Sequence, residues 1–334
     1  MRVLVVQNSF GLDHLAILNR PDPMPGPGQL LVRIRAASLN YRDLMIVKGQ
    51  YNPKLKLPRV PGSDGAGEIV AVGSGVSKFK PGDRVIGCFM QDWDSGPISA
   101  LAAQSALGGD RDGVFSELVV LEERGVVPLP DILTFEEAAT LPCAGVTAWN
   151  ALVGGDCGPS KTVLLQGTGG VSIFALQFAK ALGARVLITS GNNDKLAHAL
   201  AMGADSGMNY KENPDWDKWA RTETAGIGVD IVVEVGGAGT LERSVKSVKL
   251  GGHVALIGVL AGPATFNPIS VLMKAVRVQG VFVGSRAMFE EMIRLIASAG
   301  IRPVIDRVFP FADVVAGFRY LESAAHFGKV VVRM

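Results

Sequence analysis

The chain has 334 residues, of which 48% are hydrophobic and 19% charged, and its formal net charge is +2. This composition is typical of a globular protein, and the length exceeds what one hydrophobic core usually supports, so we expect two domains. The small net charge, without a basic block, excludes a dedicated nucleic-acid binder. No apolar run approaches the roughly 20 residues that span a bilayer, so we expect no membrane partner. The widely spaced Cys88, Cys143 and Cys157 predict no disulfide framework and a reducing, cytoplasmic setting.

The first part of the chain, from Arg2 to about Val127, consists of short β-rich runs separated by turns rich in Pro and Gly. The N-terminal MRVLVVQNSFG is interpreted as a first strand and not as a signal peptide. Many short strands with such turns predict an irregular β-barrel or sandwich. The clearest runs lie at 30–38, 65–73, 83–89 and 115–121.

After Leu129 apolar strands alternate with helical patterns, which is typical of βαβ units and a parallel sheet. We therefore predict an α/β fold with a Rossmann-type doubly wound parallel sheet over 128–286. The last residues return to mixed character, so the β-domain is expected to comprise 1–127 and 287–334. The expected strands are 162–166, 185–189, 231–235, 253–259, 276–284 and 329–334; the expected helices are 171–183, 195–203, 241–248, 287–298 and 312–322.

The segment VLLQGTGGVS at 163–172 carries the sharpest local signal. Its glycines follow an expected strand and open an expected helix, where a sharp turn and close approach to a pyrophosphate require residues without a side chain. The helix N-terminus then offers free N–H groups and a positive dipole end to that anion. Ser172 replaces the third glycine of the usual pattern. We assign the pyrophosphate site to Gly167, Gly169, Gly170 and Val171, with a purely structural turn as the alternative.

The end of the second strand, RVLITSGNNDK, bears on the choice between NAD and NADP. NAD binding favours an Asp or Glu about twenty residues beyond the glycines, which accepts hydrogen bonds from the adenosine ribose. Ser190 stands there instead, so no carboxylate repels a 2′-phosphate. We expect NADP, with NAD as the alternative. The residues assigned to this phosphate are Ser190, Asn192, Asn193, Lys195 and Tyr210. Alternatively, the segment is an ordinary polar loop in which Asp194 caps the next helix.

Five motifs occur in an order that resembles the medium-chain dehydrogenase/reductases over essentially the whole chain. The segments 39–51 and 60–85 are similar to the first zinc-ligand segment and to the Gly-His-Glu and Pro-Gly-Asp-Arg-Val signatures of zinc alcohol dehydrogenases. The other matches are 141–152, 280–285 and 326–332. The resemblance implies a GroES-like catalytic β-barrel domain beside a Rossmann domain that binds a nicotinamide cofactor.

The zinc ligands of the resembled enzymes do not carry over to this chain. Asn40 stands at the first ligand position, normally Cys, and Ser63 followed by Asp64 replaces the His–Glu pair. Only Cys143 remains, whereas a catalytic zinc needs about three Cys, His or carboxylate ligands. The lobe at 89–113, which would hold a structural zinc, has no cysteine. We therefore predict no zinc, and interpret Cys143 as a small buried apolar residue.

Zinc-free branches of the family resemble quinone oxidoreductases, zeta-crystallins and enoyl reductases, which reduce quinones or carbonyl-conjugated C=C bonds with NADPH. Without a metal, directed donors must stabilise charge on the substrate oxygen, and one such donor contributes on the order of 3 kcal/mol. Asn40 offers an amide N–H and Tyr51 a phenol, with Tyr41 as a weaker candidate. Alternatively, Asn40 only shapes a turn and Tyr51 is a surface aromatic. Asp43 is interpreted as structural.

Further cofactor contacts are expected at the carboxyl ends of the parallel strands, where ligands bind in this class of fold. The residues assigned to the nicotinamide are Thr147, Gly258, Val259, Phe282 and Val283, and the resemblance adds Lys329. The expected strand at 276–284 is apolar and long for an exposed edge, so we predict that it pairs with its copy in a homodimer.

The sequence thus predicts an NAD(P)H-dependent, zinc-independent oxidoreductase that transfers a hydride to a small-molecule quinone or α,β-unsaturated carbonyl. The first alternative is a zinc-free alcohol dehydrogenase or aldehyde reductase. The second is a non-catalytic NADPH-binding protein that acts as a sensor or structural protein.

Overall fold

The computed structural model describes residues 1–258 and 265–334 of the chain. It divides into two compact units, Met1–Val146 with Gly284–Met334, and Thr147–Val283. The sequence pattern placed the divisions after 127 and after 286. Residues 128–146 lie in the first unit because helix α3 (Phe135–Ala139) packs against three strands of that unit. These are β3 (Gln29–Leu39), β4 (Asp64–Val72) and β15 (Lys329–Arg333). No helix in the described ranges is long and apolar enough to cross a membrane.

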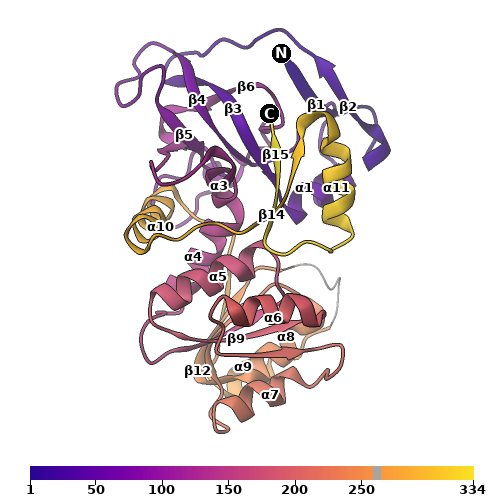
Figure 1. Ribbon diagram of the computed structural model, residues 1–334, viewed down its shortest axis with the longest axis vertical. Helices are drawn as coiled ribbons and strands as arrows, with labels where there is room; N and C mark the ends of the chain where they lie inside the picture. Colours follow the sequence, from indigo (N-terminus) through magenta and orange to yellow (C-terminus); the bar gives the residue numbers. More distant parts are fainter. Residues whose placement is uncertain (259–264) are drawn as a thin grey trace. The chain divides into compact units, whose positions relative to one another are not determined.

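The first unit is built on a sheet that comprises seven strands of the described chain, in the order β14-β15-β3-β4-β5-β7, with β6 also paired to β3 (Figure 1). β1 (Arg2–Val6) and β2 (Leu15–Asn19) form a separate antiparallel pair. The strands of the larger sheet are β3 (Gln29–Leu39), β4 (Asp64–Val72), β5 (Arg84–Gly87), β6 (Leu118–Glu122), β7 (Val126–Pro128), β14 (Ile305–Pro310) and β15 (Lys329–Arg333).

Strand β3 organises this unit because it pairs with β4, β6 and β15. Its residues Leu30, Val32 and Ile34 recur at the period of two that a strand requires and enter one apolar core. Phe115 and Phe318 meet edge to face in that core, with ring centroids 5.8 Å apart. The strand ends at Leu39, so the next residue, Asn40, leaves the sheet at the carboxyl end of an interior strand.

The helices of the first unit connect and cover these strands. Helix α1 follows β3 directly, and α11 packs on β14 and β15 near the end of the chain (Figure 1). The elements are η1 (Leu12–His14), α1 (Tyr41–Val47), α2 (Ala100–Ala103), η2 (Glu123–Gly125), η3 (Leu141–Gly145), α10 (Arg286–Ala299), η4 (Phe311–Asp313) and α11 (Val314–Glu322).

The second unit carries a parallel sheet whose described strands follow the order β10-β9-β8-β11-β12-β13. Numbered within the unit this is 3-2-1-4-5-6, the strand order of a doubly wound Rossmann fold, which confirms the predicted fold class. The chain order reverses between β8 and β11, so the loop after β8 lies at the switch point. The strands are β8 (Thr162–Gln166), β9 (Arg185–Ser190), β10 (Ser206–Asn209), β11 (Val229–Glu234), β12 (Val248–Leu256) and β13 (Arg277–Gly280).

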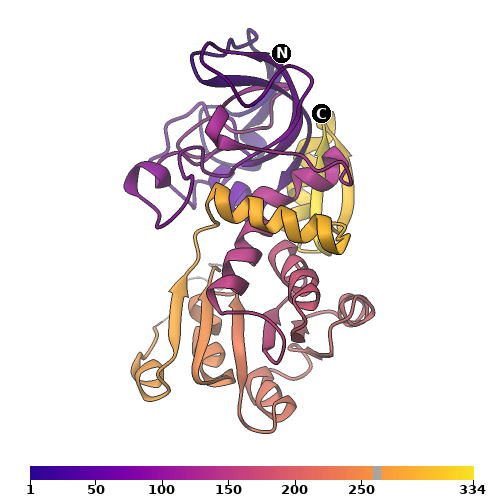
Figure 2. The same ribbon diagram turned by 90° about the vertical axis from the view of Figure 1, so that its left-hand side faces the viewer.

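Helices alternate with these strands and pack beside them (Figure 2). Helix α5 contacts β8 and β9, while α8 contacts β11 and β12. The central strands are apolar on both faces, as a sheet covered by helices requires. The helices are α4 (Val146–Gly154), α5 (Gly170–Ala181), α6 (Asn193–Ala201), α7 (Trp216–Glu223), α8 (Ala238–Ser247) and α9 (Ile269–Met273).

The last strand of the second unit, β13, is shorter than the sequence predicted. The expected strand at 276–284 was wrong in length, because β13 covers only Arg277–Gly280. Beyond it the backbone of Val283 turns into the left-handed region, with φ of 55°, which an extended strand cannot contain. β13 nevertheless lies at the edge of its sheet.

Candidate functional site

The polar centre of the first unit forms where β3 ends and α1 begins. Asn40 precedes the first residue of α1, and its backbone N–H donates a hydrogen bond of 2.9 Å to Asp43 Oδ2. Its side chain is buried, with 8% of the residue exposed. Burying an amide side chain without hydrogen-bond partners costs free energy. The hydrogen bonds of the Asn40 side chain therefore determine which of its atoms is left to bind a ligand.

Lys329 meets Asn40 from the neighbouring strand. Because Val330 pairs with Leu39, Lys329 at the start of β15 lies beside Asn40. Its Nζ donates to the backbone oxygen of Leu39 at 2.9 Å and to Asn40 Oδ1. An ammonium group has only donors, so the atom that it contacts is the amide oxygen. The Nδ2 group of Asn40 then points elsewhere, and among the described residues it has no hydrogen-bond partner.

Asp64 supplies the negative charge beside Lys329. The carboxylate lies 3.7 Å from Lys329 Nζ, and the side chains are 0% and 3% exposed. Asp64 also accepts hydrogen bonds from the Ser63 hydroxyl at 2.7 Å, the Ser38 hydroxyl at 3.3 Å and the backbone N–H of Cys143 at 3.3 Å. A buried charge needs such a partner and such donors to be stable. The sequence placed Lys329 at the cofactor and did not predict this pair.

Asp43 is a second buried carboxyl group in the same centre. Burial raises its pKa to about 6; Asp64 adds to the rise, and Arg42 is the main opposing influence. One of its oxygens holds the backbone of Asn40, while Oδ1 has no partner in the described part of the chain. These contacts agree with its interpretation as a supporting residue.

Tyr51 lies against Arg42, a residue that the sequence did not single out. The guanidinium carbon of Arg42 is 5.1 Å from the Tyr51 ring centroid and 4.5 Å from that of Phe89. Arg42 Nη1 also donates to the backbone oxygen of Leu107 at 2.8 Å, which fixes the cation in place. The Tyr51 residue is 42% exposed, so a ligand can reach it. Tyr41 opens α1 and is 43% exposed.

The side chains at the three positions that correspond to zinc ligands are Asn40, Ser63 and Cys143, and the first two are engaged in hydrogen bonds with charged side chains. Asn40 Oδ1 accepts from the Lys329 ammonium, and the Ser63 hydroxyl donates to Asp64. Burial, with Asp64 nearby, raises the pKa of the Cys143 thiol well above its ordinary range, which disfavours the thiolate that zinc requires. The fixed ammonium group would also repel a divalent cation. The thiol of Cys143 is buried but the residue as a whole is partly exposed, so its interpretation as a small buried apolar residue agrees with the structure only in part.

The lobe at 89–113 is held by charge pairs. The side chain of Asp92 is 4% exposed and pairs with Arg111 at 2.5 Å and Arg124 at 2.7 Å. Arg124 belongs to η2, and Arg111 also lies 3.5 Å from Glu122 in β6. These pairs tie the lobe to the sheet at a place where the sequence retains no cysteine.

The glycine turn of the second unit has the geometry expected of a pyrophosphate site. Gly167 follows β8 and has φ of 71°, which favours glycine, and Gly169 caps α5. A Cβ added at Gly167 or Gly169 would meet nothing within 4 Å, so open space lies over this turn. Gly170 and Val171 begin α5, a twelve-residue helix whose N-terminus suits an anion. Ser172 is buried and donates to the Gln166 carbonyl at 2.6 Å.

The predicted 2′-phosphate residues gather around the ends of β9 and β10. Ser190 is 2% exposed and accepts from the N–H of Asn192 at 3.3 Å. Asn192, and not Asp194, caps α6, because its side chain accepts from the N–H of Lys195 at 2.9 Å. The Tyr210 hydroxyl and the Lys211 side chain both lie over Gly191, within 3.0 Å of where its Cβ would be. Lys211 is a cation that the sequence interpretation missed.

The side chain of Asn193 is engaged in other contacts at the end of β10. Its Nδ2 donates to Glu212 at 2.6 Å, and its Oδ1 accepts from Asn209 at 2.7 Å. These partners tie the start of α6 to the end of β10. The side chain is thus engaged in a local network, and the assignment to the phosphate stays a prediction.

Three of the residues assigned to the nicotinamide follow strands of the second unit: Gly258 comes after β12, and Phe282 and Val283 come after β13. Thr147 is buried near the start of α4, with 3% exposed, and Phe282 is 41% exposed. Gly258 donates its N–H to the Glu234 carbonyl, and a Cβ there would lie 1.6 Å from the Val235 oxygen, so no other residue fits. Val259 lies outside the described residues.

Glu234 is a buried carboxylate that sequence reasoning missed. It ends β11 and is 0% exposed. It accepts from Gln166 at 2.8 Å, from Thr240 at 2.5 Å and from the N–H groups of Gly236 and Gly237, both at 2.8 Å. The network therefore fixes the loop after β11 beside the start of the glycine turn. Only its position at a strand end could have drawn attention to it.

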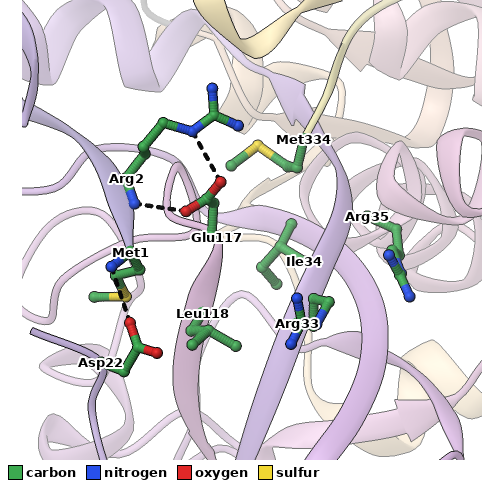
Figure 3. Close-up of a pocket in the computed structure, with 9 residues that line it drawn as sticks. All are labelled: Met1, Arg2, Asp22, Arg33, Ile34, Arg35, Glu117, Leu118 and Met334. Atoms are coloured by element: carbon green, nitrogen blue, oxygen red, sulfur yellow. Dashed lines mark hydrogen bonds and ion pairs between the residues drawn. The ribbon is translucent and has the colours of Figure 1, made fainter. Parts of the chain in front are cut away.

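A pocket of about 360 Å³ opens elsewhere in the first unit, where the two chain ends meet (Figure 3). Arg2 and Glu117 pair across it at 2.8 Å. None of the predicted site residues that the structure describes lines this pocket, so it is separate from the candidate centre. Its lining residues are Met1, Arg2, Asp22, Arg33, Ile34, Arg35, Glu117, Leu118 and Met334.

A β-domain with a buried polar centre and a parallel sheet with a glycine turn are the parts of a two-domain dehydrogenase. Comparison with family models agrees with this class. Residues 26–131 match the alcohol dehydrogenase GroES-like domain, and residues 170–298 match the zinc-binding dehydrogenase domain.

Known proteins align over nearly the whole chain. A zinc-type alcohol dehydrogenase-like protein of Schizosaccharomyces pombe is 43% identical over 100% of this chain and 99% of its own length. An acryloyl-coenzyme A reductase of Metallosphaera sedula is 30% identical over 93% of this chain and 94% of its own. A quinone oxidoreductase of Rattus norvegicus is 30% identical over 93% and 90%.

Solved structures agree in fold. A crystal structure of an NAD-dependent alcohol dehydrogenase superposes with a TM-score of 0.91 at 36% identity, over 100% of both chains. A mycobacterial protein complexed with NADPH superposes with a TM-score of 0.84 at 28% identity, also over 100% of both. The chain belongs to the medium-chain dehydrogenase/reductase superfamily and is an oxidoreductase of that family.

Proposed function

We propose that the protein transfers a hydride from NADPH to a quinone or to a C=C bond conjugated to a carbonyl, without a metal ion. The observation that carries this proposal is the state of Asn40. Its oxygen is held by Lys329, and its buried Nδ2 has no partner among the described residues. A buried donor without a partner is costly, so such a group suits a ligand oxygen that completes its hydrogen bonds.

The proposed chemistry assigns one role to each group of the centre. The cofactor, when bound, supplies the hydride. Asn40 Nδ2 donates to the substrate oxygen on which negative charge develops. Tyr51, exposed and stacked on Arg42, supplies the proton. These two donors suit an acceptor whose enolate or hydroquinone anion is delocalised, because the carbonyl of an unactivated ketone needs stronger polarisation.

Metal independence follows in this proposal from the chemistry of the donors. A zinc ion would need ligands where the chain has an amide oxygen bonded to an ammonium group, a hydroxyl bonded to a carboxylate, and a thiol whose pKa is raised by burial. Lys329 already places a fixed positive charge in this centre, paired with Asp64.

The preference for NADP rests on the strand end of β9. No acidic residue occupies the position of Ser190, and Lys195 and Lys211 both lie near this segment. Two lysines favour a 2′-phosphate over a free hydroxyl. The structural relatives include a protein bound to NADPH and an enzyme described as NAD-dependent, so their names support either cofactor.

The proposal is tested by following the oxidation of NADPH and NADH with 1,4-benzoquinone, a 2-enone and a 2-alkenal. We expect turnover with at least one acceptor, faster with NADPH, and a loss of about 100-fold in Tyr51→Phe, which removes only the hydroxyl. Absence of turnover with all three acceptors, despite cofactor binding, would favour the non-catalytic alternative.

Alcohol oxidation is a second candidate because several relatives are named alcohol dehydrogenases. The same panel separates the two activities when primary and secondary alcohols with NADP⁺ and NAD⁺ are added. If alcohols are turned over faster than the conjugated acceptors are reduced, the proposed substrate class is wrong.

We also propose a homodimer in which the edge strand β13 faces its copy. The strand is only four residues long, but α9 in the same unit exposes Ile269, Leu272 and Met273 by 60–77%. Apolar side chains exposed to this degree suit an interface. Light scattering tests the assembly: a monomeric mass at micromolar concentration would contradict it.

We further propose a reducing, cytoplasmic setting for the protein. The three unpaired cysteines agree with this proposal.

A further inference from the structure

Val283 adopts a backbone conformation that β-branched residues rarely take. Its φ is 55°, in the left-handed region, where the Cβ crowds the following carbonyl. A residue stays in this region only when its surroundings hold it there, and such residues concentrate at ligand sites. Val283 is also buried, with 6% exposed, just beyond the end of β13.

One side chain holds this peptide in place. Asn150 Nδ2 donates a hydrogen bond of 2.7 Å to the carbonyl oxygen of Val283. This is at the short end of the range for an N–H···O bond. Asn150 lies within helix α4, whose own backbone bonds make it a firm support. A second anchor precedes it, because the N–H of Val281 donates to the Leu256 carbonyl of β12 at 2.9 Å.

The hydrogen bond joins two parts of the chain that carry predicted nicotinamide contacts. Thr147 and Asn150 are three residues apart on α4, so they lie on the same face of the helix. Val283, which accepts the hydrogen bond from Asn150, is itself one of the residues assigned to the nicotinamide. The carbonyl oxygen of Val283 accepts the hydrogen bond from Asn150. The N–H of Val283 makes no hydrogen bond within the described residues, so it is left as a donor.

We propose that Asn150 is a positioning residue for the nicotinamide. It holds Val283 in the left-handed conformation, and this conformation presents the N–H of Val283 to the carboxamide oxygen of the cofactor. The inference rests on the proposed nicotinamide cofactor and deepens it. Without the Asn150 donor, Val283 relaxes to negative φ, the adjoining peptide rotates, and the N–H no longer faces the carboxamide.

The test compares two ligands that differ by the nicotinamide. NADPH contains the carboxamide, whereas 2′-phospho-ADP-ribose has the same adenosine, phosphates and riboses without it. Asn150→Asp keeps the shape of the side chain but replaces the donor with an acceptor. We expect the Kd for NADPH to rise about tenfold in this variant, or about 1.4 kcal/mol, while the Kd for 2′-phospho-ADP-ribose changes less than twofold.

A second variant tests the backbone argument separately. Val283→Gly accepts positive φ without the steric cost, so the anchor becomes less necessary. In the Val283→Gly background, Asn150→Asp is therefore expected to weaken NADPH binding less than threefold. Isothermal calorimetry gives all the affinities, and the thermal midpoint of each variant shows whether it is folded. If Asn150→Asp does not fold by itself, Asn150→Ala takes its place, measured both alone and together with Val283→Gly.

Each outcome separates this inference from the proposed function. If the unaltered protein binds neither NADPH nor NADH, both proposals fail. If it binds NADPH and Asn150→Asp weakens both ligands alike, or neither, the role of Asn150 is only structural and this inference alone is wrong. A selective loss of NADPH binding, reduced by Val283→Gly, supports it.

Discussion

Lys329 donates a hydrogen bond to the side-chain oxygen of Asn40, which lies 289 residues earlier in the chain. The contact joins the start of β15 to the end of β3, two strands that pair antiparallel. It fixes which end of the Asn40 amide is the acceptor and leaves Nδ2 as the donor. It also puts a buried ammonium group beside Asn40, the residue that stands at the first zinc-ligand position of the resembled enzymes. The proposed metal-free chemistry depends on this pair.

The role of Asn40 is tested by Asn40→Asp. The variant retains an oxygen for Lys329 but removes the N–H donor. We expect kcat/KM for the preferred acceptor to fall about 100-fold, or about 3 kcal/mol, because one directed donor to the developing charge is lost. The Kd for NADPH should change little, and Asn40→Ala serves as a variant without added charge. Unchanged kcat/KM in both variants would show that Asn40 only shapes the turn.

The buried ion pair of Lys329 and Asp64 leads us to expect that variants of Lys329 are less stable. Lys329→Met leaves Asp64 buried without its cation, so we expect the free energy of unfolding to fall by roughly 3–5 kcal/mol in urea denaturation. Adding Asp64→Asn should recover part of this loss, because the uncompensated charge is removed. Equal losses in the single and double variants would mean that packing, and not charge, explains the effect.

Asp43 predicts a dependence of stability on pH. Its pKa is raised to about 6 in the folded protein, mainly by burial, against an ordinary value near 4. The folded state therefore binds a proton more tightly than the unfolded state does. Its contribution to stability is fully present below about pH 4 and is lost as the pH rises through about 6.

The comparison with Asp43→Asn isolates this contribution. Relative to the variant, the unaltered protein should lose on the order of 2–3 kcal/mol of unfolding free energy between pH 4 and pH 7. Denaturation in urea at intervals of half a pH unit measures the difference. A difference that stays constant over this range would exclude a raised pKa for Asp43.

The cofactor preference is tested at Lys195. Lys195→Met keeps the length of the side chain and removes its charge, while its backbone N–H still bonds to Asn192. We expect the Kd for NADPH to rise about tenfold and that for NADH to change less than twofold, because only NADPH carries the 2′-phosphate. Lys211→Met is the matched comparison at the neighbouring cation. Equal effects on both cofactors would contradict the proposed phosphate site.

Local patterns in the sequence predicted most of the second unit. The glycine turn after β8 was recognisable because several glycines between an apolar strand and a helix are typical of a nucleotide-binding turn. The alternation of strands and helices likewise predicted the parallel sheet. The length of the strand at β13 was wrong because a run of apolar residues does not reveal the left-handed turn at Val283.

The contacts of the candidate centre could not be predicted in the same way. Asn40 was identified by its position in a motif, but its bond to Lys329 depends on the register between β3 and β15. Register arises from tertiary pairing and leaves no local signal. The stacking of Tyr51 on Arg42 has the same origin. The alternative interpretation named Asp194 as the cap of α6, whereas Asn192 caps it; both residue types favour that position.

The central claim is hydride transfer without a metal, and one measurement tests it directly. The protein is treated with a strong chelator, its zinc content is verified by elemental analysis, and NADPH oxidation by its best acceptor is followed before and after zinc is added. The account predicts that kcat/KM stays within twofold across all three conditions. Activity that disappears on chelation and returns only with zinc would contradict it.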